Sequence, residues 1–178
     1  MSNSIARWTG WETSERVLPS GGVESRQRVL VGKPVVETSE SGARFLGVAY
    51  WHAVDRLTRG GVRASWNANG GKLRLLGGLT LLTFGPPELS YVPGAVFCRY
   101  EIRGGRLALR AGGSVTLAQT AHGNRQELSV TVKEYLPRLA ARGRAPRWTG
   151  ALYARGQSPF HAVVSRRYFE LLLRSQAA

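Results

Sequence analysis

The sequence predicts an α+β fold in which helices pack against a curved antiparallel sheet. Between Val62 and Leu136, short segments with apolar residues are interrupted by four glycine pairs. Glycine accepts the positive φ that tight hairpin turns require, and turn signals spaced by roughly 8–12 residues are typical of an antiparallel meander. The segments on either side of the meander have helical periodicity. The pairs are Gly70-Gly71, Gly77-Gly78, Gly104-Gly105 and Gly112-Gly113.

The length of 178 residues predicts a single domain over residues 1–178, with residues 1–27 as a candidate peripheral extension. The formal net charge of +14 would suit nucleic acid or an anionic surface. Nearly all cations are arginines beside abundant Gly and Ala, which also fits GC-rich coding, so nucleic-acid binding is the less favoured alternative. No apolar run approaches the ~18 residues of a membrane helix, and we expect a soluble, cytoplasmic protein.

Motifs that would indicate a cofactor or a metal are missing from the sequence. Cys98 is the only cysteine, which excludes a cysteine-based zinc cluster and intramolecular disulfides. The chain has no GxGxxG, Walker A, HExxH or Gly-x-Ser-x-Gly motif, and its three histidines are far apart. We therefore expect no cofactor and no metal site.

A helix is predicted between Ser39 and Gly61. A stripe of apolar residues recurs there at helical spacing, Ser39 or Ser41 could cap the start, and a glycine pair follows the last turn. The stripe consists of Leu46, Tyr50, Ala53, Val54 and Leu57. His52 and Asp55 lie three apart on the opposite face, where they form either a catalytic pair or, more simply, part of a solvated surface.

Two apolar segments suggest strands of different kinds. The segment from Arg28 to Val36 is interrupted by Gly32 and Pro34, which predicts an edge strand or an irregular extended segment. The runs Leu73–Leu76 and Leu79–Phe84 are almost entirely apolar, as in strands covered on both faces.

Strand parity selects the side chains that should face the interior. Val62, Ala64 and Trp66 share one face of the first meander strand. In the segment from Ala95 to Arg103, the inward set contains Cys98 and Tyr100. The same count makes Gln119 an inward polar residue, and it places Glu134 on an apolar stripe with Val132. A buried carboxylate would cost several kcal/mol unless paired or protonated.

The last element is predicted to be an amphipathic helix that begins at Ser158-Pro159, a capping serine followed by proline in the first turn. Val164 and Tyr168 belong to its apolar stripe, and His161 lies at the flank of that stripe. Residues 148–157 either extend this helix or form a shorter one before it.

The element order resembles the START/polyketide-cyclase-like (SRPBCC, helix-grip) superfamily over about residues 40–175. The residues that carry the resemblance are Arg99 to Gly105, Gly112 to Leu117, Ser158 to His161 and Ser165 to Tyr168. The resemblance implies a curved antiparallel sheet wrapped round a long C-terminal helix, with an apolar cavity between them. A closed lipocalin-like β-barrel is the alternative fold.

The resemblance also implies a hydrophobic ligand, such as a polyketide, lipid, terpenoid or aromatic compound. The protein would act on it as a cyclase, dehydratase or lyase by shaping the substrate in its pocket, or carry it without catalysis. Glu134 and His161 are the candidate acid or base, and Tyr100 the candidate hydrogen-bond donor to a carbonyl. The ligand-binding candidates are Trp66, Cys98, Gln119, Val132, Val164 and Tyr168.

Overall fold

The computed structural model describes residues 9–137 and 148–175, and the side chains of residues 9–137 and 161–175. These residues form strands and two helices. The strands are β1 (Thr9–Val17), β2 (Val23–Val31), β3 (Val62–Asn67), β4 (Gly70–Leu75), β5 (Leu79–Phe84), β6 (Glu88–Val92), β7 (Ala95–Gly104), β8 (Ser114–His122) and β9 (Arg125–Tyr135). The helices are α1 (Glu40–Leu57) and α2 (Trp148–Ser175).

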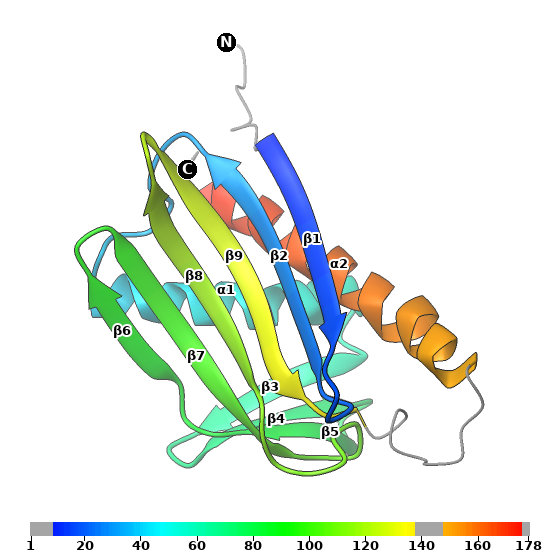
Figure 1. Cartoon of the computed structure of the whole chain (residues 1–178). Coiled ribbons are helices and arrows are strands. Elements are labelled where there is room, and N and C mark those ends of the chain that lie inside the picture. Colours follow the sequence, from blue (N-terminus) through cyan, green and yellow to red (C-terminus); the bar gives the residue numbers. More distant parts are fainter. Residues whose placement is uncertain (1–8, 138–147, 176–178) are drawn as a thin grey trace.

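The strands form one antiparallel sheet in the order β1-β2-β9-β8-β7-β5-β4-β3, with β6 paired to β7 (Figure 1). β5 meets β7 at only two residue pairs, Thr83 with Gly104 and Phe84 with Ile102. Beyond this short junction, strands β3, β4 and β5 turn across the end of the main sheet; we call them the β3–β5 arm. The sheet ends at β1 and β3 and is open, so the alternative of a closed barrel is wrong.

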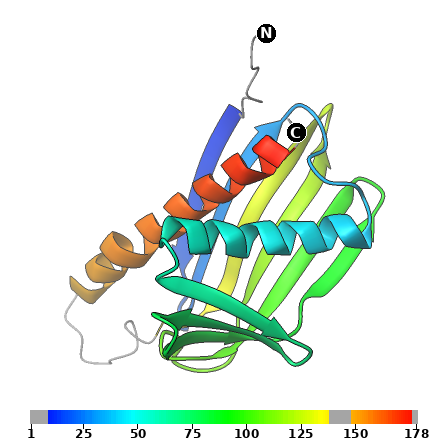
Figure 2. The same ribbon diagram turned by 180° about the vertical axis from the view of Figure 1, so that it is seen from behind.

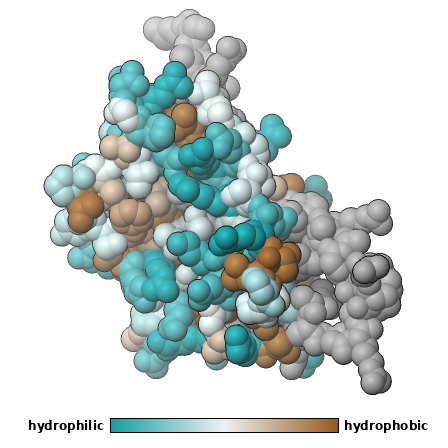
Figure 3. Space-filling view, viewed as in Figure 1, coloured by the Kyte–Doolittle hydropathy of each residue, from teal (hydrophilic) through white to brown (hydrophobic). Residues whose placement is uncertain are grey.

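Both helices lie on one face of the sheet, with α1 running between α2 and the β3–β5 arm (Figure 2). This arrangement confirms the predicted α+β, helix-grip fold. The opposite face of the sheet is mostly hydrophilic, with apolar residues confined to small patches (Figure 3). Within the part of the chain that the structure describes, neither helix is long and apolar enough to cross a membrane.

α1 forms where its pattern predicts it, because its cap and its buried stripe agree. The Ser39 hydroxyl accepts a hydrogen bond from the Gly42 N–H at 3.1 Å, which satisfies one of the free amides of the first turn. Leu46, Tyr50 and Val54 are buried against the sheet. At the other end the Thr58 hydroxyl donates to the Val54 carbonyl at 2.9 Å.

The strand predicted from Ala95 to Arg103 is confirmed as β7, with Val96, Cys98, Tyr100 and Ile102 all buried. The prediction of an edge or irregular segment from Arg28 to Val36 is wrong for its first half. Arg28 to Val31 belongs to β2, an internal strand between β1 and β9, and Gly32 and Pro34 come after it. The glycine and the proline therefore end the strand.

The C-terminal helix starts earlier than its capping signal suggests. α2 begins at Trp148, so Ser158 and Pro159 lie within it, and the alternative in which residues 148–157 extend the helix is the one observed. Its second half packs against the sheet through fully buried side chains, and the Trp11 ring of β1 meets the Phe169 ring edge-on at 5.9 Å. The largest of these fully buried side chains are Val164, Tyr168, Phe169 and Leu172.

Candidate functional site

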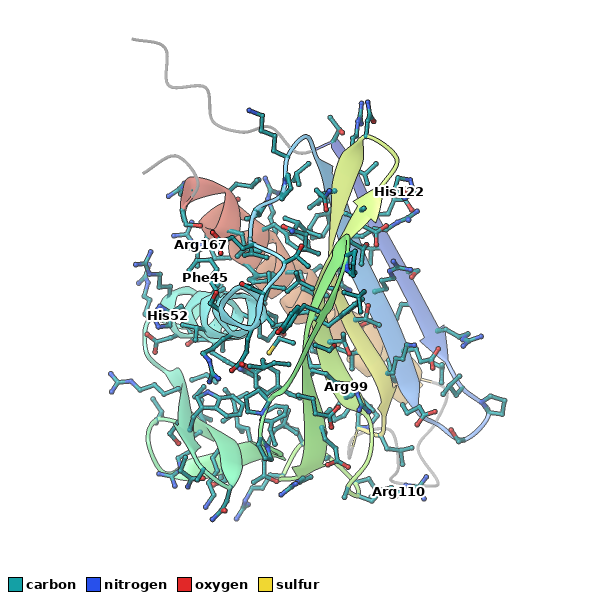
Figure 4. All side chains as sticks on the ribbon, turned by 90° about the vertical axis from the view of Figure 1, so that its left-hand side faces the viewer. Phe45, His52, Arg99, Arg110, His122 and Arg167 are labelled. Carbon is teal, nitrogen blue, oxygen red and sulfur yellow. The ribbon has the colours of Figure 1, made fainter. Side chains whose placement is uncertain are left out.

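A cleft of about 640 Å³ opens between α1, β3 and the β6–β7 hairpin. We call it the aromatic cleft. Figure 4 views the molecule nearly along α1, with the β3–β5 arm below the helix and the main sheet beside both. The wall residues are Arg44, Val48, Trp51, His52 and Asp55 of α1, Arg63, Ala64, Trp66 and Asn67 of β3, Pro87, Leu89 of β6, and Cys98 and Tyr100 of β7.

Three aromatic rings dominate this wall. The ring centroids of Trp66 and Tyr100 lie 4.7 Å apart, and Trp51 lies 5.4 Å from each of them. Phe84 of β5 adds a fourth ring at 5.1 Å from Trp51. Tilted and edge-on rings at such separations attract one another beyond the effect of area burial. The cleft therefore has an apolar side of mutually inclined rings, and the partly exposed Trp66 is the ring on which a ligand ring could stack.

Two glycines allow these rings to lie where they do. Gly71 is the cross-strand partner of Trp66, and a Cβ on it would lie 2.3 Å from the indole ring. A Cβ on Gly47 of α1 would lie 2.2 Å from the hydroxyl oxygen of Tyr100. Side chains do not approach so closely, so any larger residue at either position must displace a ring of the cleft.

The inner end of the aromatic cleft is polar but uncharged. The Tyr100 hydroxyl lies beside Gly47, and burial, reinforced by Cys98, raises the pKa of Tyr100 far above neutrality. Tyr100 is therefore a phenol that can donate a hydrogen bond. Burial also raises the pKa of Cys98 to about 11, which keeps it a thiol and makes it a poor nucleophile.

The indole N–H of Trp51 adds a second donor near this end. It is buried and has no hydrogen-bond partner among the described residues. A weak interaction of this N–H with the Tyr100 hydroxyl acts to lower the pKa of Tyr100 against the larger effect of burial, but it does not meet the geometry of a hydrogen bond. A buried donor without a partner is costly, and an acceptor on a ligand would relieve that cost.

The mouth of the aromatic cleft is charged. Arg44 and Arg63 are exposed cations on opposite walls, and His52 and Asp55 are the other ionisable groups of the α1 wall. Arg44 pairs with Glu40 at 2.8 Å, and the Nε of Arg63 donates to the Gly60 carbonyl at 3.2 Å. The cleft thus combines an apolar aromatic interior with a charged opening, where Arg44 is paired with Glu40 and Asp55 adds a carboxylate.

Three of the predicted site residues meet in this cleft. Trp66, Cys98 and Tyr100 all line it, and Tyr100 and Cys98 face inward as strand parity predicts. Gln119 is also inward and buried, but its side chain holds the loop before α1: its Oε1 accepts from the N–H groups of Val35 and Val36 at 2.6 and 2.9 Å. It does not line the aromatic cleft.

Val132, Val164 and Tyr168 lie in the core on the α2 side of the sheet and do not line the aromatic cleft. The Tyr168 hydroxyl is buried without a hydrogen-bond partner in the described part of the chain, and burial raises the pKa of Tyr168. The cavity expected between the sheet and the C-terminal helix is thus displaced: the cleft lies beside α1. A ligand-binding role for these three residues stays a prediction without support from the cleft geometry.

Glu134 is exposed, so the prediction that it faces the interior is wrong. The register between β2 and β9 shifts opposite Val23 and Ser25, and Glu134 itself has a φ of 53°. Such a bulge inserts an extra residue and changes which later side chains face inward. Tyr135 is buried instead, and Glu134 borders a groove on the outer face of the sheet.

His161 is half-buried on α2 and lies near Glu15 of β1. Burial lowers the pKa of His161, and the charge of Glu15 opposes that shift. His161 does not line the aromatic cleft, so the structure does not bring it together with Tyr100.

Sequence reasoning missed Trp51, Arg44 and Arg63. Trp51 follows Tyr50 at the flank of the apolar stripe of α1, a position from which a large ring can reach a neighbouring strand. Arg63 alternates along β3 with Val62 and Ala64, so the alternation of the strand predicts that its side chain faces solvent. Only the turn of the β3–β5 arm beneath α1 brings these residues to one opening. Among the described residues, no group of His, Cys, Asp and Glu could hold a metal ion.

No protein-family model and no curated protein matches this chain. Among solved structures it is similar to the solution structure of CalU16 from Micromonospora echinospora, with 13% identity over 97% of this chain and 78% of that chain and a TM-score of 0.43. An HSP90 activator from Plasmodium falciparum matches with 17% identity over 75% of this chain and 86% of that chain, with a TM-score of 0.35. DynU16, a protein from the dynemicin biosynthetic locus, matches with 21% identity over 79% of this chain and 45% of that chain, with a TM-score of 0.33. Similarity at this level does not identify a ligand.

Proposed function

We propose that this protein binds a hydrophobic small molecule with an aromatic portion in the aromatic cleft. The observation that carries the proposal is the wall formed by Trp51, Trp66 and Tyr100 along an opening of about 640 Å³. Ligand pockets commonly have volumes of roughly 300–1,000 Å³ and combine apolar walls with a few polar groups. A planar ring could stack on the exposed part of Trp66 while the inner wall removes it from water.

The polar groups of the aromatic cleft suggest how such a ligand would be oriented. The neutral Tyr100 phenol and the unpartnered Trp51 N–H favour a hydrogen-bond acceptor, such as a carbonyl oxygen, at the inner end. Arg44 and Arg63 favour an acidic or electron-rich substituent at the mouth. Among the predicted ligand classes, aromatic polyketides and other aromatic compounds therefore suit this site better than plain hydrocarbons do.

Carriage without catalysis needs the fewest additional groups. Glu134 lies on the outer face and His161 lies away from the cleft, so neither reaches a ligand in it. A cyclase, dehydratase or lyase is the second candidate, because His52 and Asp55 both border the cleft and could move a proton at its mouth. In that case Tyr100 would stabilise a developing oxyanion.

Titration with the aromatic anion anilinonaphthalene sulfonate, followed by its fluorescence, tests the proposed binding site. We expect Trp66→Ala to weaken binding about tenfold, since it removes the exposed ring of the wall. Trp11→Ala is the matched control: the two tryptophans are 37% and 36% exposed, but Trp11 lies on β1 against Phe169. Equal effects of the two substitutions, or no effect of either, would exclude the aromatic cleft as the binding site.

Native mass spectrometry of the purified protein then addresses the choice between carrier and enzyme. A co-purified hydrophobic compound that stays unchanged on incubation supports carriage. A change in its mass that is abolished by His52→Ala, while the compound is still bound, supports the catalytic alternative. His52 is exposed, so its substitution leaves the core intact.

A further inference from the structure

The turn between β4 and β5 presents three leucines to solvent. Leu75, Leu76 and Leu79 are 36%, 83% and 39% exposed. We call them the leucine tip. The apolar runs Leu73–Leu76 and Leu79–Phe84 predict strands covered on both faces, and that prediction is wrong at this end: the arm leaves its terminal leucines uncovered. Monomeric proteins rarely expose large apolar side chains in a contiguous group without a use for them.

The backbone holds the leucine tip in a defined shape. Leu76 has a φ of 49°, in the left-handed region that few residues other than glycine adopt. Its N–H donates to the Gly61 carbonyl at 2.7 Å, and the Gly78 N–H donates to the Leu75 carbonyl at 3.2 Å. A strained leucine at the most exposed position contributes nothing to the core. The turn is therefore fixed in a conformation that directs leucine outward, although glycine would fit it with less strain.

Arginines border the leucine tip. Arg63 and Arg74 face each other across β3 and β4, one register step from the pair Val62 and Leu75. The backbone of Arg106 bonds to Thr80, which is in turn the partner of Arg74. Like charges directly opposite each other destabilise a sheet. The Nε of Arg74 is also buried without a hydrogen-bond partner within the described residues.

The stretch of chain around these arginines carries no acidic residue between Asp55 and Glu88. Residues 56–87, which comprise the β3–β5 arm and its flanks, contain five cations and neither Asp nor Glu. The cations are Arg56, Arg59, Arg63, Lys72 and Arg74. An anion from outside the molecule would therefore find apolar side chains and unneutralised arginines at the same end of the arm.

We propose that the leucine tip docks on an anionic lipid bilayer. The leucines would enter the boundary of the acyl layer, while the neighbouring arginines contact lipid phosphates. Binding of this kind scales with the buried apolar area and with the attraction of basic residues to anionic lipids. A protein partner fits less well, because three leucine side chains cannot supply the roughly 800 Å² that a stable interface takes from each partner. Arg63 borders both sites, but docking on a bilayer, tested at Leu76 and Arg74, does not require a ligand in the aromatic cleft.

Co-sedimentation with vesicles tests the proposal, using phosphatidylcholine alone and phosphatidylcholine mixed with phosphatidylserine. We expect binding to the mixed vesicles and a loss of at least tenfold in Leu76→Asp, because a carboxylate replaces the side chain that enters the bilayer. Val92→Asp is the matched control. Val92 is 55% exposed at the β6–β7 turn, where residues 89–98 contain neither Arg nor Lys. Arg74→Gln should weaken binding to mixed vesicles about fivefold.

A fluorescent label reports insertion directly. Leu76→Cys can be labelled with an environment-sensitive dye, because the only native cysteine, Cys98, is buried. We expect a blue shift of the dye on mixed vesicles. The proposal is overturned by absence of binding, by binding that Leu76→Asp leaves unchanged, or by equal losses in Leu76→Asp and Val92→Asp. Unchanged binding in Leu76→Asp would mean that the net positive charge alone attracts the vesicles.

Discussion

Beneath α2 the inner face of the sheet is covered by fully buried side chains, whereas beside α1 it borders the open aromatic cleft. Val164, Tyr168 and Phe169 are at most 1% exposed, while Trp66 in the cleft is 37% exposed. The two regions share one sheet and differ in its path. Under α2 the strands pair along their length, but β5 meets β7 at only two residue pairs, and the arm beyond them turns away. The opening therefore arises from the bend of the sheet, while the aromatic composition of its wall comes from the sequence.

The largest expected effect is a difference in the free energy of unfolding between a substitution on the α2 side and one in the aromatic cleft. Phe169→Ala should lower the free energy of unfolding by about 4 kcal/mol, because it removes a fully buried ring from a tightly packed region. Trp66→Ala should cost about 1 kcal/mol, since its ring is partly exposed and its loss leaves open solvent rather than a cavity. Urea unfolding measures both. Similar losses would show that the cleft side is packed as tightly as the α2 side.

Gln119 tests whether an inward polar residue serves the fold or a ligand. Gln119→Leu should cost about 2 kcal/mol, because the amides of Val35 and Val36 lose their acceptor and the Val36 carbonyl loses a donor. Hydrogen exchange at these two amides should speed up, and dye binding in the aromatic cleft should not change. Gln126→Leu, a half-buried glutamine of β9, is the control. A loss of dye affinity in Gln119→Leu alone would assign the residue to the site after all.

Gly47 tests how closely α1 must approach the floor of the aromatic cleft. Gly47→Ala gains about 1 kcal/mol of helix propensity but forces a Cβ against the Tyr100 hydroxyl, at a cost of roughly 1–3 kcal/mol. We expect a net loss of about 1 kcal/mol together with weaker dye binding. Gly71→Ala should affect binding with less loss of stability, since the Trp66 ring can move outward. Stabilisation by Gly47→Ala would show that Tyr100 is free to shift.

The smallest effect concerns pH on the α2 side. Burial lowers the pKa of His161 below its usual 6.5, so the unfolded chain binds a proton more readily than the folded one. Above pH 6.5 His161 is neutral in both states, and it does not reduce the free energy of unfolding. As the pH falls from 6.5 towards the lowered pKa, protonation of the unfolded chain lowers the free energy of unfolding. His161→Gln should flatten this dependence in urea midpoints measured across that window. An unchanged profile would assign the pH dependence to other groups.

Local pattern was sufficient for the elements and for part of the site. The alternation of β7 correctly placed Cys98 and Tyr100 inward, and the stripe of α1 correctly marked Leu46, Tyr50 and Val54. These predictions succeeded because each depends on residues close together in one regular element. The open sheet agrees with the glycine-separated meander as well.

Predictions failed where a residue's environment depends on an irregularity of a strand or on how distant elements pack. A parity count cannot foresee the bulge that turns Glu134 outward. An apolar run such as Leu73–Leu76 has the same pattern whether another element covers it or it ends at an exposed turn. The aromatic cleft could not be predicted because it forms only where the β3–β5 arm bends and brings Trp66 of β3 against Trp51 of α1.

The contact between Gly47 and Tyr100 has a consequence for how sequences related to this one can vary. A Cβ at position 47 and a phenolic oxygen at position 100 cannot coexist in this geometry. The same Cβ would lie 2.8 Å from the Cys98 sulfur. Relatives that carry alanine or a larger residue at position 47 should therefore carry phenylalanine or a smaller residue at position 100, together with a residue smaller than cysteine at position 98. Position 47 is expected to covary with these two positions, which are far from it in the chain.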